Sequence, residues 1–138
     1  MNRYSYHSHT ADVIMKVRAD TVAKLFETAM CGMSNLLKNK LCEEWDKGAE
    51  EKNIFVQSVD ITALLIDFLS EVLLESHINK TIYCKLNIIK QTDKEIEAVI
   101  SGKKVDFFDE DIKAVTYHEA FVSQSGDKQW EANIIFDI

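Results

Sequence analysis

The segment HSHTAD, residues 7–12, combines two histidines with an aspartate, residue types that bind metal ions or move protons. Alternate residues of a strand point to one side, so His7 and His9 can face the same metal ion. One class of metal-dependent hydrolases uses the pattern HxHxDH, in which aspartate and histidine follow the pair. Here Ala11 and Asp12 occupy those two positions, so the segment is incomplete as a catalytic zinc site. An isolated His-x-His pair is more often two polar residues that enter a strand.

Asp12 interrupts an apolar pattern at the start of a strand, where a buried carboxylate needs a cation or hydrogen-bond donors. The other end of the chain offers a similar setting, because a strongly apolar run leads directly into Asp137 and Ile138. The α-carboxylate of Ile138 adds a third oxygen-bearing group. Oxygen ligands suit Ca²⁺, Mg²⁺ or Mn²⁺ better than zinc. The sequence therefore indicates a divalent-metal site, with solvated carboxylates as the alternative.

Two segments show the apolar spacing of three and four residues that is typical of amphipathic helices. The first covers residues 21–38 and follows Asp20, a residue type that favours the helix N-cap. The second begins after Asp60, another N-cap candidate. Because Ile66 and Leu74 lie off its apolar stripe, we expect this helix to be covered on more than one side and to be the core element.

The remaining periodic segments indicate about six strands, since they alternate apolar and polar residues or are rich in β-branched residues. They cover residues 11–19, 54–59, 81–90, 95–102, 114–123 and 129–138. Residues 39–53 are charged and aperiodic, which predicts a solvated connector with at most a short helical turn and a candidate partner surface. The expected fold is an α+β single domain over residues 1–138, with two helices packed on a largely antiparallel sheet.

Composition excludes several classes of protein. With 16 lysines and arginines against 23 aspartates and glutamates, the net charge is −7, which opposes binding to a nucleic-acid backbone. No apolar run approaches a transmembrane helix, and the N-terminal residues lack the apolar core of a signal peptide. We therefore expect a cytoplasmic protein with no direct contact to nucleic acid or membrane. Cys31, Cys42 and Cys84 lack CxxC spacing, which predicts buried thiols rather than a disulfide framework or zinc knuckle.

Four ordered motifs carry a resemblance that extends nearly from end to end. They are HTAD at residues 9–12, DITALLIDFLSEVLLES at 60–76, IKAVTYHEAFV at 112–122, and Trp130 with the closing FDI. In these motifs the chain resembles the archease family, small activators of the tRNA-splicing RNA ligase. The resemblance implies an α+β fold of two helices and a largely antiparallel sheet.

The resemblance also implies a function without catalysis by the protein itself. Archease-like proteins promote guanylylation and repeated turnover of a ligase that joins 3′-phosphate or 2′,3′-cyclic-phosphate RNA ends to 5′-hydroxyl ends. The ligase is therefore the expected partner, and tRNA splicing the expected process.

The family's functional residues carry over onto matching positions of this chain. Asp12 and Asp137, with Ile138 beside them, correspond to residues that hold a divalent metal ion, with Ca²⁺ as first choice and Mg²⁺ or Mn²⁺ as alternatives. Lys113 corresponds to a lysine that is important for activation; without the resemblance it would pass as a solvated surface lysine. His118 in the same motif is expected to be structural.

Two positions depart from the family pattern. Ser8 stands where an acidic residue is usual, which predicts weaker metal binding than elsewhere in the family. Ile14 replaces a usual glycine and asks for ordinary strand geometry at that point.

Two other functions use the same carboxylates. The first is a small metal-dependent phosphoesterase with His7 or His9 as general base. Against it stand the absence of a nucleophile motif, a chain with only four glycines and no phosphate-cradling loop, and an acidic net charge. The second is a scaffold in which the metal is only structural.

Overall fold

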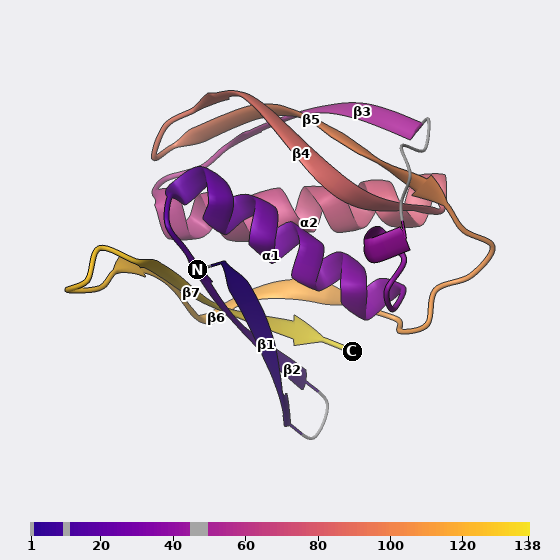
Figure 1. The fold of residues 1–138 in the computed structure, drawn as a ribbon, viewed down its shortest axis with the longest axis horizontal. Coiled ribbons are helices and arrows are strands. Elements are labelled where there is room, and N and C mark those ends of the chain that lie inside the picture. Colours follow the sequence, from indigo (N-terminus) through magenta and orange to yellow (C-terminus); the bar gives the residue numbers. More distant parts are fainter. Residues whose placement is uncertain (1, 10–11, 45–49) are drawn as a thin grey trace.

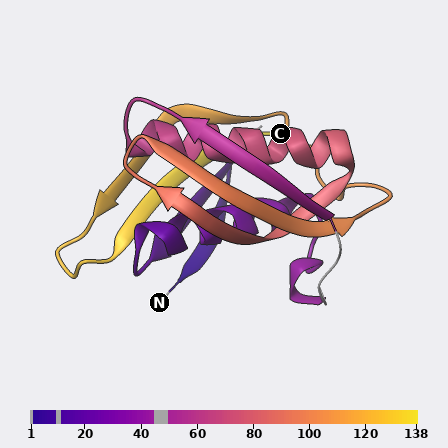
Figure 2. The same ribbon diagram turned by 90° about the horizontal axis from the view of Figure 1, so that it is seen from above.

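A computed structural model describes residues 2–9, 12–44 and 50–138 of the chain. Within these residues two helices, α1 (Val22–Leu37) and α2 (Ile61–Asn79), form a middle layer between two antiparallel sheets (Figure 1). The view from above shows the strands of one sheet crossing over both helices (Figure 2). The expected α+β class is therefore confirmed. No helix in the described part of the chain is long and apolar enough to cross a membrane.

Seven strands form the two sheets within the described ranges, and every neighbouring pair is antiparallel. The first sheet has the order β1 (Arg3–His9), β2 (Asp12–Ala19), β7 (Trp130–Asp137) and β6 (Ala114–Gln124). The second has the order β3 (Glu50–Gln57), β5 (Glu95–Lys104) and β4 (Thr81–Gln91).

These strands differ from the expectation of about six strands in one sheet. The strand that sequence reasoning missed is β1, an edge strand with tyrosines rather than aliphatic residues on its inner side. In addition, β3 begins within the charged segment that was predicted to be a connector. Edge strands are half solvated, so charged residues in them hide the alternation on which the prediction relied.

The cap of α1 is one residue later than predicted. Thr21, rather than Asp20, is the N-cap, and its Oγ1 accepts a hydrogen bond from the backbone N–H of Lys24 at 3.1 Å. Asp20 instead accepts a hydrogen bond from Nε2 of Gln129 at 2.6 Å. This contact ties the start of α1 to the turn between β6 and β7, so tertiary structure redirected the aspartate.

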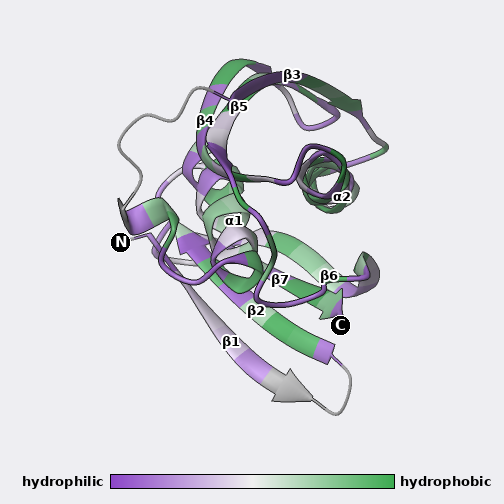
Figure 3. Ribbon diagram, turned by 90° about the vertical axis from the view of Figure 1, so that its right-hand side faces the viewer, coloured by the Kyte–Doolittle hydropathy of each residue, from purple (hydrophilic) through white to green (hydrophobic). Residues whose placement is uncertain are grey.

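The second helix follows its prediction closely. Asp60 is its N-cap and accepts a hydrogen bond from the backbone N–H of Ala63 at 2.8 Å. Ile66, which lies off the apolar stripe, is 1% exposed, so α2 is indeed covered on more than one side. Leu74 is 50% exposed and does not share that burial. The end-on view shows α2 between the two sheets with one side open (Figure 3).

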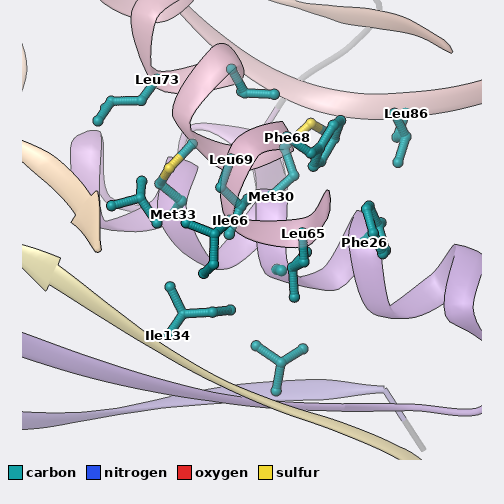
Figure 4. Packing of buried hydrophobic residues seen from close by; sticks show 14 of the residues in the cluster. Phe26, Met30, Met33, Leu65, Ile66, Phe68, Leu69, Leu73, Leu86 and Ile134 are labelled. Carbon is teal, nitrogen blue, oxygen red and sulfur yellow. The ribbon is translucent and has the colours of Figure 1, made fainter. Parts of the chain in front are cut away.

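The core lies where both helices meet both sheets. Phe26 of α1 and Phe68 of α2 are fully buried, and their tilted rings have centroids 5.4 Å apart. Ile134 of β7 and Leu86 of β4 close the interior from opposite sides (Figure 4). Because one continuous core joins all three layers, a change in either sheet is transmitted to both helices.

Side-chain hydrogen bonds tie α1 to the sheets on either side. The hydroxyl of Ser34 donates to the backbone carbonyl of Tyr83 in β4 at 2.6 Å. The phenol of Tyr6 in β1 donates to the backbone carbonyl of Gly32 at 2.6 Å. Burial raises the pKa of Tyr6, so this phenol stays protonated and remains a donor at neutral pH.

The cysteines correct a prediction. Cys42 and Cys84 form a disulfide with Cα atoms 5.2 Å apart, a separation typical of such bonds. The bond joins the short 3₁₀ helix η1 (Cys42–Glu44) to β4. Cys31 remains a thiol, and burial raises its pKa to about 11. Spacing could not reveal this pair, because its members meet only in the folded chain. The expected short helical turn in the connector is confirmed by η1, whereas residues 45–49 of that candidate partner surface lie outside the described residues.

Replacing Gly102 by alanine should destabilise the fold. A Cβ there would overlap the backbone carbonyl of Ile82, at the point where β4 has an irregular register. Overpacking of this kind costs about 1–3 kcal/mol, because backbone cannot move aside as a side chain can. Chemical denaturation should therefore give a lower free energy of unfolding for G102A. Gly126→Ala is the matched control, since nothing lies within 4 Å of its Cβ position. Equal stability of the two variants would contradict this packing.

Alkylation should count the thiols of the protein. In denaturant without reductant one alkyl group should be added, at Cys31, and after reduction three should be added, as read from the intact mass. Reduction should also lower the free energy of unfolding by about 3 kcal/mol, because the bond restricts the unfolded chain. Cys31→Ser should abolish labelling of the unreduced protein. Three groups on unreduced wild type would show that the Cys42–Cys84 bond is absent.

Candidate functional site

The pairing of β2 with β7 brings the two ends of the chain together. Asp12, the first residue of β2, lies opposite Asp137, the last residue of β7, in the antiparallel register. Directly opposite residues of this kind have Cβ atoms about 4.5–5.5 Å apart. Both aspartates are half-buried, and the next pair on the same face is Ile14 and Ile135. The two carboxylates thus share one edge of an apolar strip.

Lys113 lies beside this pair. Its backbone N–H donates a hydrogen bond to the backbone carbonyl of Asp137 at 2.7 Å. The preceding residue, Ile112, is fully buried and anchors the segment, while Lys113 itself is exposed. Ala114 then opens β6 as the register partner of Asp137. The structure therefore brings Asp12, Asp137 and Lys113 to the same end of one sheet.

Ile138 follows Asp137 directly, and its side chain packs against the core. This packing holds the end of the chain close to Asp137. The main chain at Ile138 is therefore kept beside Asp137.

The donor set suits a hard divalent cation. No cationic side chain in the described residues forms an ion pair with Asp12 or Asp137, and like charges directly opposite in a sheet repel. A cation bound between the two carboxylates would remove that repulsion. Within the same described ranges no group of three or more His, Cys, Asp or Glu side chains converges on one point. An ion here would thus need ligands besides these two side chains.

Of the two histidines in the HSHTAD segment, the structure describes the side chain of His7 alone. His7 is exposed and lies opposite Ile14. His9 is the register partner of Asp12, but its side chain lies outside the described residues, as do Thr10 and Ala11.

The motif around His118 contains a feature that sequence reasoning missed. Between Thr116 and Phe121 the pairing of β6 with β7 is interrupted by a bulge. Glu119 in the bulge has a positive φ of 54°. His118 is exposed, with Nε2 only 3.8 Å from the Glu119 carboxylate, so it adds little to interior packing.

Tyr117 connects this bulge to α2. Its phenol donates a hydrogen bond to the carboxylate of Asp67, and that contact raises the pKa of Tyr117. The run of polar residues Tyr117, His118 and Glu119 inside an otherwise apolar strand was the available signal. The bulge fastens β6 to the helix layer and so fixes the strand that Lys113 precedes.

Comparison with known proteins gives one consistent result. The model of the Archease protein family (MTH1598/TM1083) matches residues 4–138. A protein archease of Methanosarcina mazei is 30% identical, over 99% of this chain and 96% of its own length. A protein archease of Pyrococcus abyssi is 27% identical over the full length of both chains.

Solved structures agree with the fold. The solution structure of protein 1598 of Methanobacterium thermoautotrophicum superposes with a TM-score of 0.76 at 22% identity, covering 98% of each chain. The crystal structure of a Thermotoga maritima archease, described as a possible chaperone, gives a TM-score of 0.59 at 21% identity, covering 96% of this chain and 94% of the other. Identities at this level support the fold alone. The family model and the full-length relatives go further: this chain belongs to the archease family.

Proposed function

We propose that this protein activates the tRNA-splicing RNA ligase, promoting guanylylation of the ligase and its repeated turnover. The ligase joins 3′-phosphate or 2′,3′-cyclic-phosphate RNA ends to 5′-hydroxyl ends, and the protein itself makes no bond. Family membership supports the proposal. The observation that carries it is the meeting of Asp12, Asp137 and Lys113 at one end of a sheet, although they come from three separate parts of the chain.

The carboxylates of Asp12, Asp137 and the Ile138 terminus would hold a divalent cation, with Ca²⁺ as first choice and Mg²⁺ or Mn²⁺ as alternatives. When bound, the ion supplies the concentrated positive charge that nucleotidyl transfer needs. The chain's own contribution is position, because β2 and β7 are central strands held by the core on their inner side. Ser8 stands where the family usually has an acidic residue, so we expect weaker metal binding than elsewhere in the family.

Lys113 provides a second positive charge. Its backbone is hydrogen bonded to Asp137 while its side chain is exposed, so the ammonium group can reach a partner. An exposed lysine next to an acidic pair is suited to contact a phosphate or carboxylate of the ligase. In the cytoplasm, where we expect the protein to act, such a contact would be moderated by salt.

The carboxylate pair should be required for both metal binding and activation. Asp12→Asn and Asp137→Asn should each weaken Ca²⁺ or Mn²⁺ binding, measured by calorimetric titration, and reduce multiple-turnover ligation together. Each variant removes one of two facing ligands, so a loss of about tenfold in affinity is expected. Asp93→Asn, in the exposed β4–β5 turn of the other sheet, is the matched control and should change neither.

Three results would contradict this proposal. Wild type that leaves the ligation rate unchanged would remove the activator role. Hydrolysis of a cyclic-phosphate RNA by the protein alone, lost in Asp12→Asn, would instead favour the phosphoesterase. Metal binding that depends on both aspartates without any effect on ligation would leave a structural metal scaffold.

Charge reversal at Lys113 should separate activation from stability. Lys113→Glu should weaken activation of the ligase, because the exposed cation becomes an anion beside the acidic pair. Its free energy of unfolding should stay within about half a kcal/mol of wild type, as for most surface substitutions. Lys103→Glu in the other sheet makes the same charge change and should activate normally. Full activation by Lys113→Glu would take Lys113 out of the site, and a large loss of stability would assign it to the packed structure.

A further inference from the structure

The outer face of the β1-β2-β7-β6 sheet is hollowed at the end opposite the carboxylates. A pocket of about 480 Å³ opens there, of a size that accommodates small ligands. Its lining includes the cationic residues Arg3, Lys16 and Arg18, together with Phe121, Glu131 and Asn133. Asp12 and Lys16 share this face of β2 and are four residues apart, or about 13 Å at the usual rise of a strand. The pocket is therefore distinct from the proposed metal site.

The charge of the pocket opposes that of the whole chain. Arg3 and Arg18 are register partners on adjacent strands, an arrangement that is unfavourable for two like charges. Arg18 is compensated by Asp127 at 3.0 Å and Glu131 at 3.3 Å. Within the described residues, neither Arg3 nor Lys16 forms an ion pair with a carboxylate. In a protein with a net charge of −7, two exposed cations without an ion-pair partner among the described residues make this pocket favourable for an anion.

The pocket also offers an apolar surface beside the cations. Phe121 is 45% exposed and lies opposite Asn133 in the register of β6 with β7. Exposure of a phenylalanine ring is costly in water but suits stacking against a flat ring of a ligand. Ser5, Val17 and Ala132 complete the lining. The cations thus suit a charged part of a ligand, and the ring of Phe121 suits a flat part of the same ligand.

We infer that this pocket binds a phosphorylated small molecule with a flat ring, of the nucleotide class. Arg3 and Lys16 meet the phosphate group, and Phe121 stacks on the base. One phosphate group needs only a local cluster of cations, so the overall negative charge, which opposes a long nucleic-acid backbone, does not prevent it. This inference stands on the pocket alone and does not depend on activation of the ligase.

The test is a titration of the full-length protein, followed by calorimetry and by amide chemical shifts. ADP and GDP should bind and shift the amides of Lys16, Arg18 and Asn133. Ribose 5-phosphate, which lacks the base, and adenosine, which lacks the phosphate, should each bind more weakly. Inorganic phosphate should be the weakest anion, because it reaches the cations without the ring.

Substitutions test the cationic part and the aromatic part of the pocket separately. Arg3→Glu and Lys16→Glu should each weaken ADP binding about tenfold, since each removes a charge-assisted contact. Phe121→Ala should weaken ADP about fivefold but leave ribose 5-phosphate unchanged, because it removes only the stacking surface. Lys103→Glu, an exposed residue of the second sheet, is the matched control for charge. Thermal unfolding of each variant should match wild type.

Several outcomes would overturn the inference. Failure of wild type to bind ADP and GDP at millimolar concentration would do so directly. An equal loss in Lys103→Glu would show that only the long-range field matters. If a short polyglutamate peptide binds as tightly as ADP and Phe121→Ala has no effect on either, the face serves an acidic protein segment rather than a nucleotide.

Discussion

The antiparallel pairing of β2 with β7 is the constraint on which the rest of the molecule depends. These central strands of the first sheet come from opposite ends of the chain. Their inner residues, such as Met15 and Phe136, are fully buried against the helices, while their outer residues carry the charges. Because side chains alternate along a strand, a slip of one residue would exchange the two faces. The core therefore fixes the register, and the register places Asp12 opposite Asp137.

The helix layer explains why the outer face can hold charged groups at little cost. Both sheets pack against α1 and α2 (Figure 3), and their buried apolar residues join those of the helices in one core. On the first sheet this leaves an acidic end, an apolar strip and a basic hollow along one surface. Because its two ends carry opposite charges, this face is electrostatically polar along its length. A partner or ligand would meet that face in one orientation.

Sequence reasoning succeeded where a pattern is local. The alternation of Val13, Met15 and Val17 and the spacing within both helices follow from backbone geometry, and each was confirmed. The prediction that Asp60 caps the second helix was confirmed for the same reason. The prediction that Asp20 caps the first helix was wrong, because the distant Gln129 side chain binds its carboxylate. Edge strand β1 and the start of β3 were missed, since half-solvated strands tolerate charge and show weak alternation.

The candidate site likewise has features that follow from the sequence and features that arise only in the folded chain. The sequence alone determined which groups are available: two aspartates at the chain ends, a lysine in a family motif, and apolar segments long enough to bury a core. Only the tertiary structure decided which of them meet. It set Asp12 against Asp137, brought the backbone of Lys113 to the latter, joined Cys42 to Cys84, and gathered Arg3 and Lys16 at one pocket. Residue types and short-range periodicity are written along the chain, whereas contacts between remote segments depend on strand order and register, which the shared core selects.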